Sequence, residues 1–335
     1  MSTNNRYSQI DKLKVLCSLM IICIHAKFYG LFGDYFSSLA RFAVPVFFMI
    51  SGFFFNVKSS PKQIIKLFRL MVLSNAIYLA FKCLRLSGGE RFIFISKLIT
   101  LDNIVEFVLV NYNKLQSHLW YLGAILYTSV CFFFLYKVCS DQKRMKRILN
   151  AIVPILLLSD LILGKYSLFI FNREFSTPFI RNWLFVGIPY YYIGIWIRDN
   201  YLTLSRIVTR TVLLCSLLLS SIGVVAVKYI LITNNLNATR DHYLLTTIQA
   251  VSIFLYFLFY VNKNKNFISS IGERYTTWIY ILHPMIMTVN EDVINRIKSI
   301  DFSFYQFLRP FIVFIITLSF VMIVSNIRTL FSRKT

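Results

Sequence analysis

The amino-acid sequence predicts an all-α integral membrane protein with about ten transmembrane helices. Of its 335 residues, 57% are hydrophobic and 15% are charged, and the mean hydropathy is +0.64. Soluble proteins carry about 25% charged residues. In addition, apolar stretches as long as a membrane-spanning helix recur along the whole chain. These observations exclude a disordered or collagen-like chain.

The apolar stretches define the expected spans, because about 20 residues at 1.5 Å per residue cross about 30 Å of hydrocarbon. The ten expected spans are residues 13–32, 39–55, 67–84, 119–136, 148–163, 183–197, 208–232, 243–261, 275–289 and 307–327. The first is longer than the apolar core of a signal peptide and is expected to stay as an anchor. We expect residues 1–335 to form a single transmembrane domain.

Residues 91–110 form a further apolar stretch that differs from the spans. Lys97, Asp102 and Glu106 interrupt it. A partly charged helix of this kind is typical of the membrane interface, so we expect an interfacial helix here.

The formal charge of +22 arises from 36 Lys and Arg residues against 14 Asp and Glu residues. If the ten spans alternate across the membrane, the side that holds both termini carries a net +17 and the opposite side +5. Basic residues accumulate in short cytoplasmic loops, so both termini are expected in the cytoplasm. Orientation and attraction to anionic lipid account for most of the charge. Nucleic-acid binding would need a basic soluble module, which the sequence lacks.

Two common kinds of site are not expected. The six cysteines show no C-x-x-C pairing, and most lie inside apolar stretches, so we expect buried thiols and no bound metal. The sequence contains no Walker or dinucleotide-binding fingerprint, which argues against a nucleotide site of those kinds.

Ionisable residues within the expected spans are functional candidates, because such a residue costs about 2.5–3.5 kcal/mol at the centre of a membrane helix. His25 lies in the first span, slightly past its expected midplane, and Lys14 precedes it by 11 residues. That spacing places both on one helical face, about 16 Å apart. A lone histidine on an apolar helix is more often a packing residue, and a lysine at a span end usually snorkels. The motifs around His25 and Lys14 decide between a functional role and an ordinary structural role for these two residues.

Basic and aromatic residues also gather at span ends. Lys66 and Arg69 begin the third span and are three residues apart, which suits either phosphate binding or the positive-inside rule. His118 and Trp120 open the fourth span, and Arg181 precedes the sixth. Aromatic belts at the membrane interface are the ordinary explanation of such residues.

Five motifs follow one another over residues 10–284. They are IDKLK (10–14) with His25, VPVFFMISGF (44–53), HLWYL (118–122), RN (181–182) leading to GIPY (187–190) and Gly194, and IYILHP (279–284). In this order they resemble the acyltransferase-3 family of integral membrane acyltransferases. Two features depart from the family. The usual arginine of the first motif is Lys14, and the third-span basic cluster lacks a following proline. A lysine carries charge but cannot bind phosphate through two parallel donors.

The resemblance implies a ten-helix, multi-pass protein of the cell membrane, in bacteria the cytoplasmic membrane. It further implies transfer of an acyl group, usually acetyl, from acetyl-CoA at the cytoplasmic side to a hydroxyl of a cell-envelope sugar or related acceptor. No permanently bound cofactor is expected. On this hypothesis His25 is the base, since imidazole with a pKa near 6.5 is available in neutral form. Lys14, Lys66 and Arg69 would hold the CoA phosphates, and Asp11 would orient Lys14.

The same motifs supply further pocket candidates for substrate binding. These are Ser51, His118, Trp120, Arg181, Asn182, Tyr280 and His283.

Transport is the competing function. Some members of the family form the membrane domain of vancomycin-resistance serine racemases, where the domain is associated with supplying L-serine to the racemase. This alternative would connect the protein to antibiotic resistance and leaves open a soluble partner domain after residue 335. Lys14 in place of arginine makes loss of CoA chemistry more plausible. Binding of CoA and uptake of serine are the two measurements that separate the alternatives.

Overall fold

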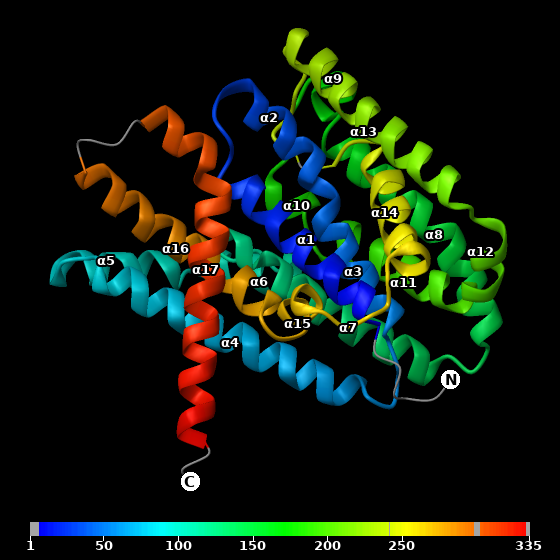
Figure 1. Ribbon diagram of the computed structural model, residues 1–335, viewed down its shortest axis with the longest axis horizontal. Coiled ribbons are helices and arrows are strands. Elements are labelled where there is room, and N and C mark those ends of the chain that lie inside the picture. The colour runs from blue at the N-terminus through cyan, green and yellow to red at the C-terminus, as the bar shows by residue number, and fades with distance from the viewer. Residues whose placement is uncertain (1–6, 241, 298–301, 333–335) are drawn as a thin grey trace. The chain divides into compact units, whose positions relative to one another are not determined.

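The computed structural model describes residues 7–240, 242–297 and 302–332, and within these residues all regular structure is helical (Figure 1). The predicted all-α class is confirmed. The chain falls into two compact units. Unit 1 comprises Met1–Phe47, Ser205–Ile230 and Leu244–Thr335, and unit 2 comprises Phe48–Leu204 and Leu231–Tyr243.

Unit 1 contains both ends of the chain. Its helices are α1 (Ser8–His25), α2 (Gly30–Leu39), η1 (Ala40–Phe42), α13 (Arg210–Thr233) for most of its length, α14 (Thr246–Tyr260), α15 (Phe267–Arg274), α16 (Thr276–Arg296) and α17 (Phe302–Ser332). In Figure 1, α17 is the long red helix and α1 is blue.

Helix α1 is the central element of unit 1. It packs most extensively against α15 and also contacts α2, η1, α14, α16 and α17. Its apolar side chains Ile10, Leu13 and Cys17 are completely buried. Gly272 of α15 makes the closest approach, because a Cβ atom there would come within 1.9 Å of the Asp11 carbonyl oxygen. The backbones of α1 and α15 therefore touch at this crossing.

Unit 2 holds the middle of the chain. Its helices are α4 (Ser60–Leu84), α5 (Gly88–Leu98), α6 (Leu101–Val110), η2 (Ser117–Leu119), α7 (Trp120–Val138), α8 (Gln142–Leu163), α9 (Ser167–Phe171), α10 (Thr177–Ile180), the π-helical turn η3 (Trp183–Gly187) and α11 (Ile188–Asp199). Helices α3 (Ala43–Phe53) and α12 (Tyr201–Ile207) each have residues in both units.

Glycines bring the helices of unit 2 together at two places. A Cβ atom on Gly187 would lie 2.3 Å from Thr128 Oγ1, so η3 packs tightly on α7. A Cβ atom on Gly52 would lie 1.8 Å from the Tyr191 carbonyl oxygen, and one on Gly194 would lie 2.1 Å from that of Met49. Small residues that let helix backbones approach are typical of membrane proteins.

Five stretches among the described residues are long and apolar enough to cross a membrane. They are Gly30–Phe53, Ser60–Leu84, Ser117–Val138, Arg210–Thr233 and Phe304–Ile327. Each overlaps one of the expected spans, and α14 is a shorter apolar helix that overlaps another. The count of ten spans and the cytoplasmic placement of the termini stay predictions.

The expectation of one continuous helix over residues 13–32 is wrong. Helix α1 ends at His25, where Ala26 leaves the helical conformation with φ −100° and ψ 67°. The next helix, α2, starts at Gly30, whose φ of 62° lies in the left-handed region that glycine adopts readily. His25 is therefore the last residue of a helix.

The stretch over residues 91–110 forms two helices where one was expected. Helix α5 begins with a capping box between Ser87 and Glu90, and α6 begins after Thr100, whose side chain accepts a hydrogen bond from the Asn103 N–H. Neither helix has a buried residue. Their location at a membrane interface stays a prediction.

Candidate functional site

Two histidines adjoin each other in unit 1. His25 is the last residue of α1 and is exposed, while His283 lies in α16 and is completely buried. Their ring centroids are 5.3 Å apart, with the ring planes tilted by 43°. His25 lies in the last turn of α1, at the carbonyl end of this helix.

Backbone carbonyl groups hold the buried histidine. Nδ1 of His283 lies 2.8 Å from the Tyr280 carbonyl oxygen and 3.1 Å from the Ile279 carbonyl oxygen. The Tyr280 ring itself is buried, with its centroid 6.2 Å from that of His283. The structure thus brings together three of the predicted site residues: His25, Tyr280 and His283.

Asp11 and Lys14 form an ion pair in the first half of α1. Lys14 Nζ lies 2.8 Å from Asp11 Oδ1, with 25% of the lysine side chain and 5% of the aspartate side chain exposed. The expected contact between these residues is therefore present. His25 follows Lys14 by eleven positions on the same helix, which corresponds to about 16 Å along its axis.

In unit 2, three predicted site residues lie around the start of α7. The Arg181 guanidinium stacks over the Trp120 ring at 5.3 Å from its centroid. His118 is buried, and its ring centroid lies 5.2 Å from that of Tyr78. A cation stacked on an indole in this way is stabilised by the electrostatics of the ring face.

Asn182 caps the π-helical turn that follows it. Its Oδ1 accepts hydrogen bonds from the backbone N–H groups of Leu184 at 2.9 Å and Phe185 at 3.1 Å. Its Nδ2 donates to the carbonyl oxygens of Pro178 and Phe179. Both Oδ1 and Nδ2 of Asn182 therefore bind backbone groups close to it in the chain.

The remaining predicted residues of unit 2 lie elsewhere. Ser51 is half-buried in α3, directly before Gly52. Lys66 and Arg69 are exposed on the first half of α4. Exposed cations can meet a phosphate without the desolvation cost of a buried one.

One buried hydrogen-bonded pair of side chains carries no predicted function. Asp160 Oδ2 of α8 forms a short hydrogen bond with His242 Nδ1, and both side chains are less than one-tenth exposed. The ring of His242 also adjoins that of Tyr190 at 5.6 Å. Asp160 is an acidic residue within the expected span 148–163, but no local sequence pattern identifies His242 as its partner.

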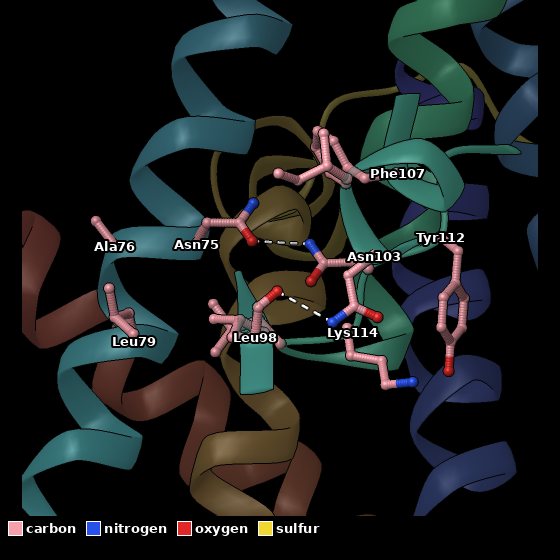
Figure 2. A pocket seen from close by; sticks show the side chains of 11 residues that line it. Asn75, Ala76, Leu79, Leu98, Asn103, Phe107, Tyr112 and Lys114 are labelled. Atoms are coloured by element: carbon pink, nitrogen blue, oxygen red, sulfur yellow. Dashed lines mark hydrogen bonds between the residues drawn. The ribbon is translucent and has the colours of Figure 1, made fainter. Parts of the chain in front are cut away.

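Unit 2 also contains a cavity of about 320 Å³ between α4, the end of α5, α6 and residues 112–115. Its walls are mostly apolar, and Figure 2 shows amide groups of Asn75 and Asn103 among them. Asn113 Nδ2 donates to Asn75 Oδ1 at 2.8 Å, and Asn103 Nδ2 donates to the Leu98 carbonyl oxygen at 3.1 Å. Apolar walls with a few polar groups are typical of small-molecule sites. None of the predicted site residues lines this cavity.

A metal centre finds no support in the part of the chain that the structure describes. There, no group of three or more His, Cys, Asp or Glu side chains is placed to hold a metal ion.

Membrane-length apolar helices and a histidine pair at the end of the first helix define a helical membrane protein with a candidate site for proton transfer. Residues 7–326 match the family described as "Acyltransferase domain" (Acyl_transf_3). The chain belongs to this family of membrane acyltransferases, which confirms the resemblance seen in the motifs. Comparisons with curated proteins and with solved structures gave no significant match.

Proposed function

We propose that this protein is a membrane-bound O-acyltransferase. It moves an acyl group, acetyl in the first instance, from cytoplasmic acyl-CoA to a hydroxyl of a cell-envelope sugar or a related acceptor. The family match over residues 7–326 carries this proposal. The reaction is placed at the cell membrane, in bacteria the cytoplasmic membrane, with both termini inside. Acyl-CoA acts as a cosubstrate that binds and leaves.

His25 is the proposed general base. Its neutral imidazole accepts the proton of the acceptor hydroxyl while the hydroxyl oxygen attacks the thioester carbonyl carbon. The new C–O ester bond forms, the C–S bond breaks, and the imidazolium gives its proton to the CoA thiolate. The exposure of His25 supports this assignment because a substrate can reach its ring.

Basic side chains are the proposed contacts of the CoA phosphates. In unit 1, Asp11 holds the Lys14 ammonium, which keeps a fixed position while staying partly exposed. In unit 2, Lys66 and Arg69 offer exposed donors on α4. Hydrogen bonds between such cations and phosphate oxygens are about twice as strong as neutral ones.

Acetyl transfer in membranes tests the proposal. Membrane vesicles from cells that express the protein are incubated with radiolabelled acetyl-CoA, and alkali-labile label in envelope glycans is counted. We expect His25→Ala to reduce this label by about 100-fold or more, because general bases contribute about 10²–10⁴-fold. Lys27→Ala is the matched control, since Lys27 is a neighbouring exposed residue that pairs with Asp34. Full labelling by folded His25→Ala protein would refute the base assignment.

Transport of L-serine remains the rival proposal for the same membrane domain. It predicts serine flux into proteoliposomes that contain the purified protein, together with no binding of acetyl-CoA. Acetyl-CoA binding by the wild-type protein without serine flux supports the transferase, and the reverse result refutes it.

A further inference from the structure

A proline in α16 removes a hydrogen-bond donor beside the histidine pair. Pro284 lies inside this helix and, like every proline, has no backbone N–H. In a regular helix the N–H at this position would donate to the carbonyl oxygen four residues earlier, which belongs to Tyr280. The Tyr280 carbonyl oxygen therefore loses its usual donor from the helix backbone.

The side chain of His283 supplies a donor at this place. Its Nδ1 lies 2.8 Å from the Tyr280 carbonyl oxygen. A carbonyl oxygen only accepts hydrogen bonds, so Nδ1 carries a proton. In the neutral ring, Nε2 is then the unprotonated nitrogen. Pro284 and the Tyr280 carbonyl together fix both the tautomer and the orientation of His283.

The unprotonated nitrogen belongs to the ring that adjoins His25. A centroid separation of 5.3 Å allows a nitrogen of one ring to come within hydrogen-bond distance of a nitrogen of the other. His283 is completely buried, whereas His25 is exposed. The His283 ring is thus held by its own helix, and the His25 ring is accessible to a substrate.

We propose that His283 is a positioning residue for His25, and that its Nε2 accepts a hydrogen bond from one ring N–H of His25 once substrate is bound. The other nitrogen of His25 is then unprotonated and available to the acceptor hydroxyl. This inference rests on the proposed function, because it requires His25 to act as the base. In many enzymes the base that activates the nucleophile is itself oriented by a third group.

The proton balance follows from this arrangement. The unprotonated nitrogen of His25 takes the hydroxyl proton, and the N–H of the other ring nitrogen donates to His283 Nε2 while the ring is positively charged. The same nitrogen then gives its proton to the CoA thiolate as the C–S bond breaks. His283 neither gains nor loses a proton over the cycle.

Two substitutions of His283 separate positioning from packing. His283→Asn keeps a donor near the Nδ1 position but has no acceptor at the Nε2 position, whereas His283→Gln can place an amide oxygen there. We expect kcat for acetyl transfer to fall by about 100-fold in His283→Asn and to recover partly in His283→Gln. The KM for acetyl-CoA is expected to stay within about twofold. Wild-type kcat per folded molecule in His283→Asn would overturn the proposal.

Pro284 permits a test that leaves both histidines in place. Pro284→Ala restores a backbone N–H to the Tyr280 carbonyl, and this donor competes with Nδ1–H of His283. We expect a higher unfolding temperature, because an interior proline destabilises a helix, together with a kcat at least about threefold lower. In Pro284→Ala the stability is then expected to rise while the activity falls. A loss of packing would lower both.

Pro310→Ala is the matched control. Pro310 is also a proline inside a helix of unit 1, in α17, and it is buried. We expect this variant to gain stability and to keep the wild-type kcat. If Pro284→Ala also keeps the wild-type kcat, the positioning role is refuted.

Nitrogen-15 NMR of histidine-labelled protein in proteoliposomes reads the tautomer without turnover. Among the four histidines, the His283 signals are assigned by their loss in His283→Asn. We expect a protonated Nδ1 and an unprotonated Nε2 in the wild-type protein, and a mixture of tautomers in Pro284→Ala. A tautomer mixture in the wild-type protein refutes the positioning role even where acetyl transfer is observed. A single tautomer without any acetyl transfer refutes the proposed function, and with it the role of His283.

Discussion

The carbonyl oxygen of Asp11 lies 1.9 Å from the point that a Cβ atom on Gly272 would occupy. A larger residue at this crossing must push α1 and α15 apart. We expect Gly272→Ala to lower the free energy of unfolding by about 1–3 kcal/mol, as overpacking of a core does. Because α1 carries Lys14 and His25, activity per folded molecule is expected to fall too.

The control for this prediction is Gly89→Ala. Gly89 lies in α5, and nothing comes within 4 Å of its added Cβ atom. Thermal unfolding in detergent compares the two variants with the wild-type protein. Equal unfolding temperatures for both alanine variants would show that the α1–α15 crossing tolerates a side chain.

A reciprocal pair of glycines joins α3 and α11 in unit 2. Gly52 faces the Tyr191 carbonyl, and Gly194 faces the Met49 carbonyl. Since each glycine makes room for the opposite backbone, one alanine already separates the helices. We therefore expect Gly52→Ala and Gly194→Ala to be destabilising and their combination to cost less than the sum of the two. Additive losses in a double-mutant cycle of unfolding free energies would contradict a shared contact.

The phosphate contacts proposed for Lys66 and Arg69 predict a change in KM. The double variant Lys66→Ala/Arg69→Ala is expected to raise the KM for acetyl-CoA about tenfold or more while kcat changes little, because binding lost equally in ground and transition states appears in KM. Steady-state kinetics on purified protein provide the measurement. Lys143→Ala/Arg144→Ala removes two other exposed cations, from α8, and should leave both constants unchanged.

The buried pair of Asp160 and His242 is expected to support the fold of unit 2. His242→Ala leaves the Asp160 carboxyl group without this partner, and removing one partner of a buried hydrogen bond costs about 1–3 kcal/mol. Asp160→Asn/His242→Gln keeps two neutral hydrogen-bonding groups at the same positions and should lose less. Thermal unfolding of both variants measures the difference. A His242→Ala protein as stable as the wild type would show that the pair contributes nothing.

For Asn182, capping and substrate binding predict different results. Loss of the cap in Asn182→Ala is expected to cost about 0.5–2 kcal/mol of stability, with unchanged KM in the folded fraction. Asn182→Asp keeps a side-chain oxygen that can accept hydrogen bonds from the Leu184 and Phe185 N–H groups, so it should recover part of the loss. An Asn182→Ala variant of normal stability but raised KM would instead favour the substrate-binding prediction.

The helical class and much of the course of the chain could be predicted from composition and apolar run length. The expected span 119–136, for example, coincides closely with the candidate membrane helix Ser117–Val138. The length of an apolar stretch determines whether a helix can cross a membrane, and this length can be read from the local sequence alone. The family motifs likewise predict His25, Tyr280 and His283 as site residues, and these three residues lie together in the structure.

The break after His25 could not be predicted in this way. Apolar residues continue beyond it, and the buried ring of Phe28 packs against Phe307 and Phe311 of α17. These contacts join segments from opposite ends of the chain. The same holds for His25 with His283 and for Asp160 with His242, because each pair depends on the tertiary fold and leaves no local pattern.

The apolar helices differ in how much of their surface the protein itself covers. In the candidate membrane stretches of α13 and α17 only 22% of residues are buried, against 56% in the stretch that contains α7. Lipid, unlike a protein core, accepts almost any apolar shape. A saturation-mutagenesis screen that exchanges one apolar residue for another should therefore find α13 and α17 permissive and α7 restrictive. Natural sequence drift in this protein is expected to follow the same division.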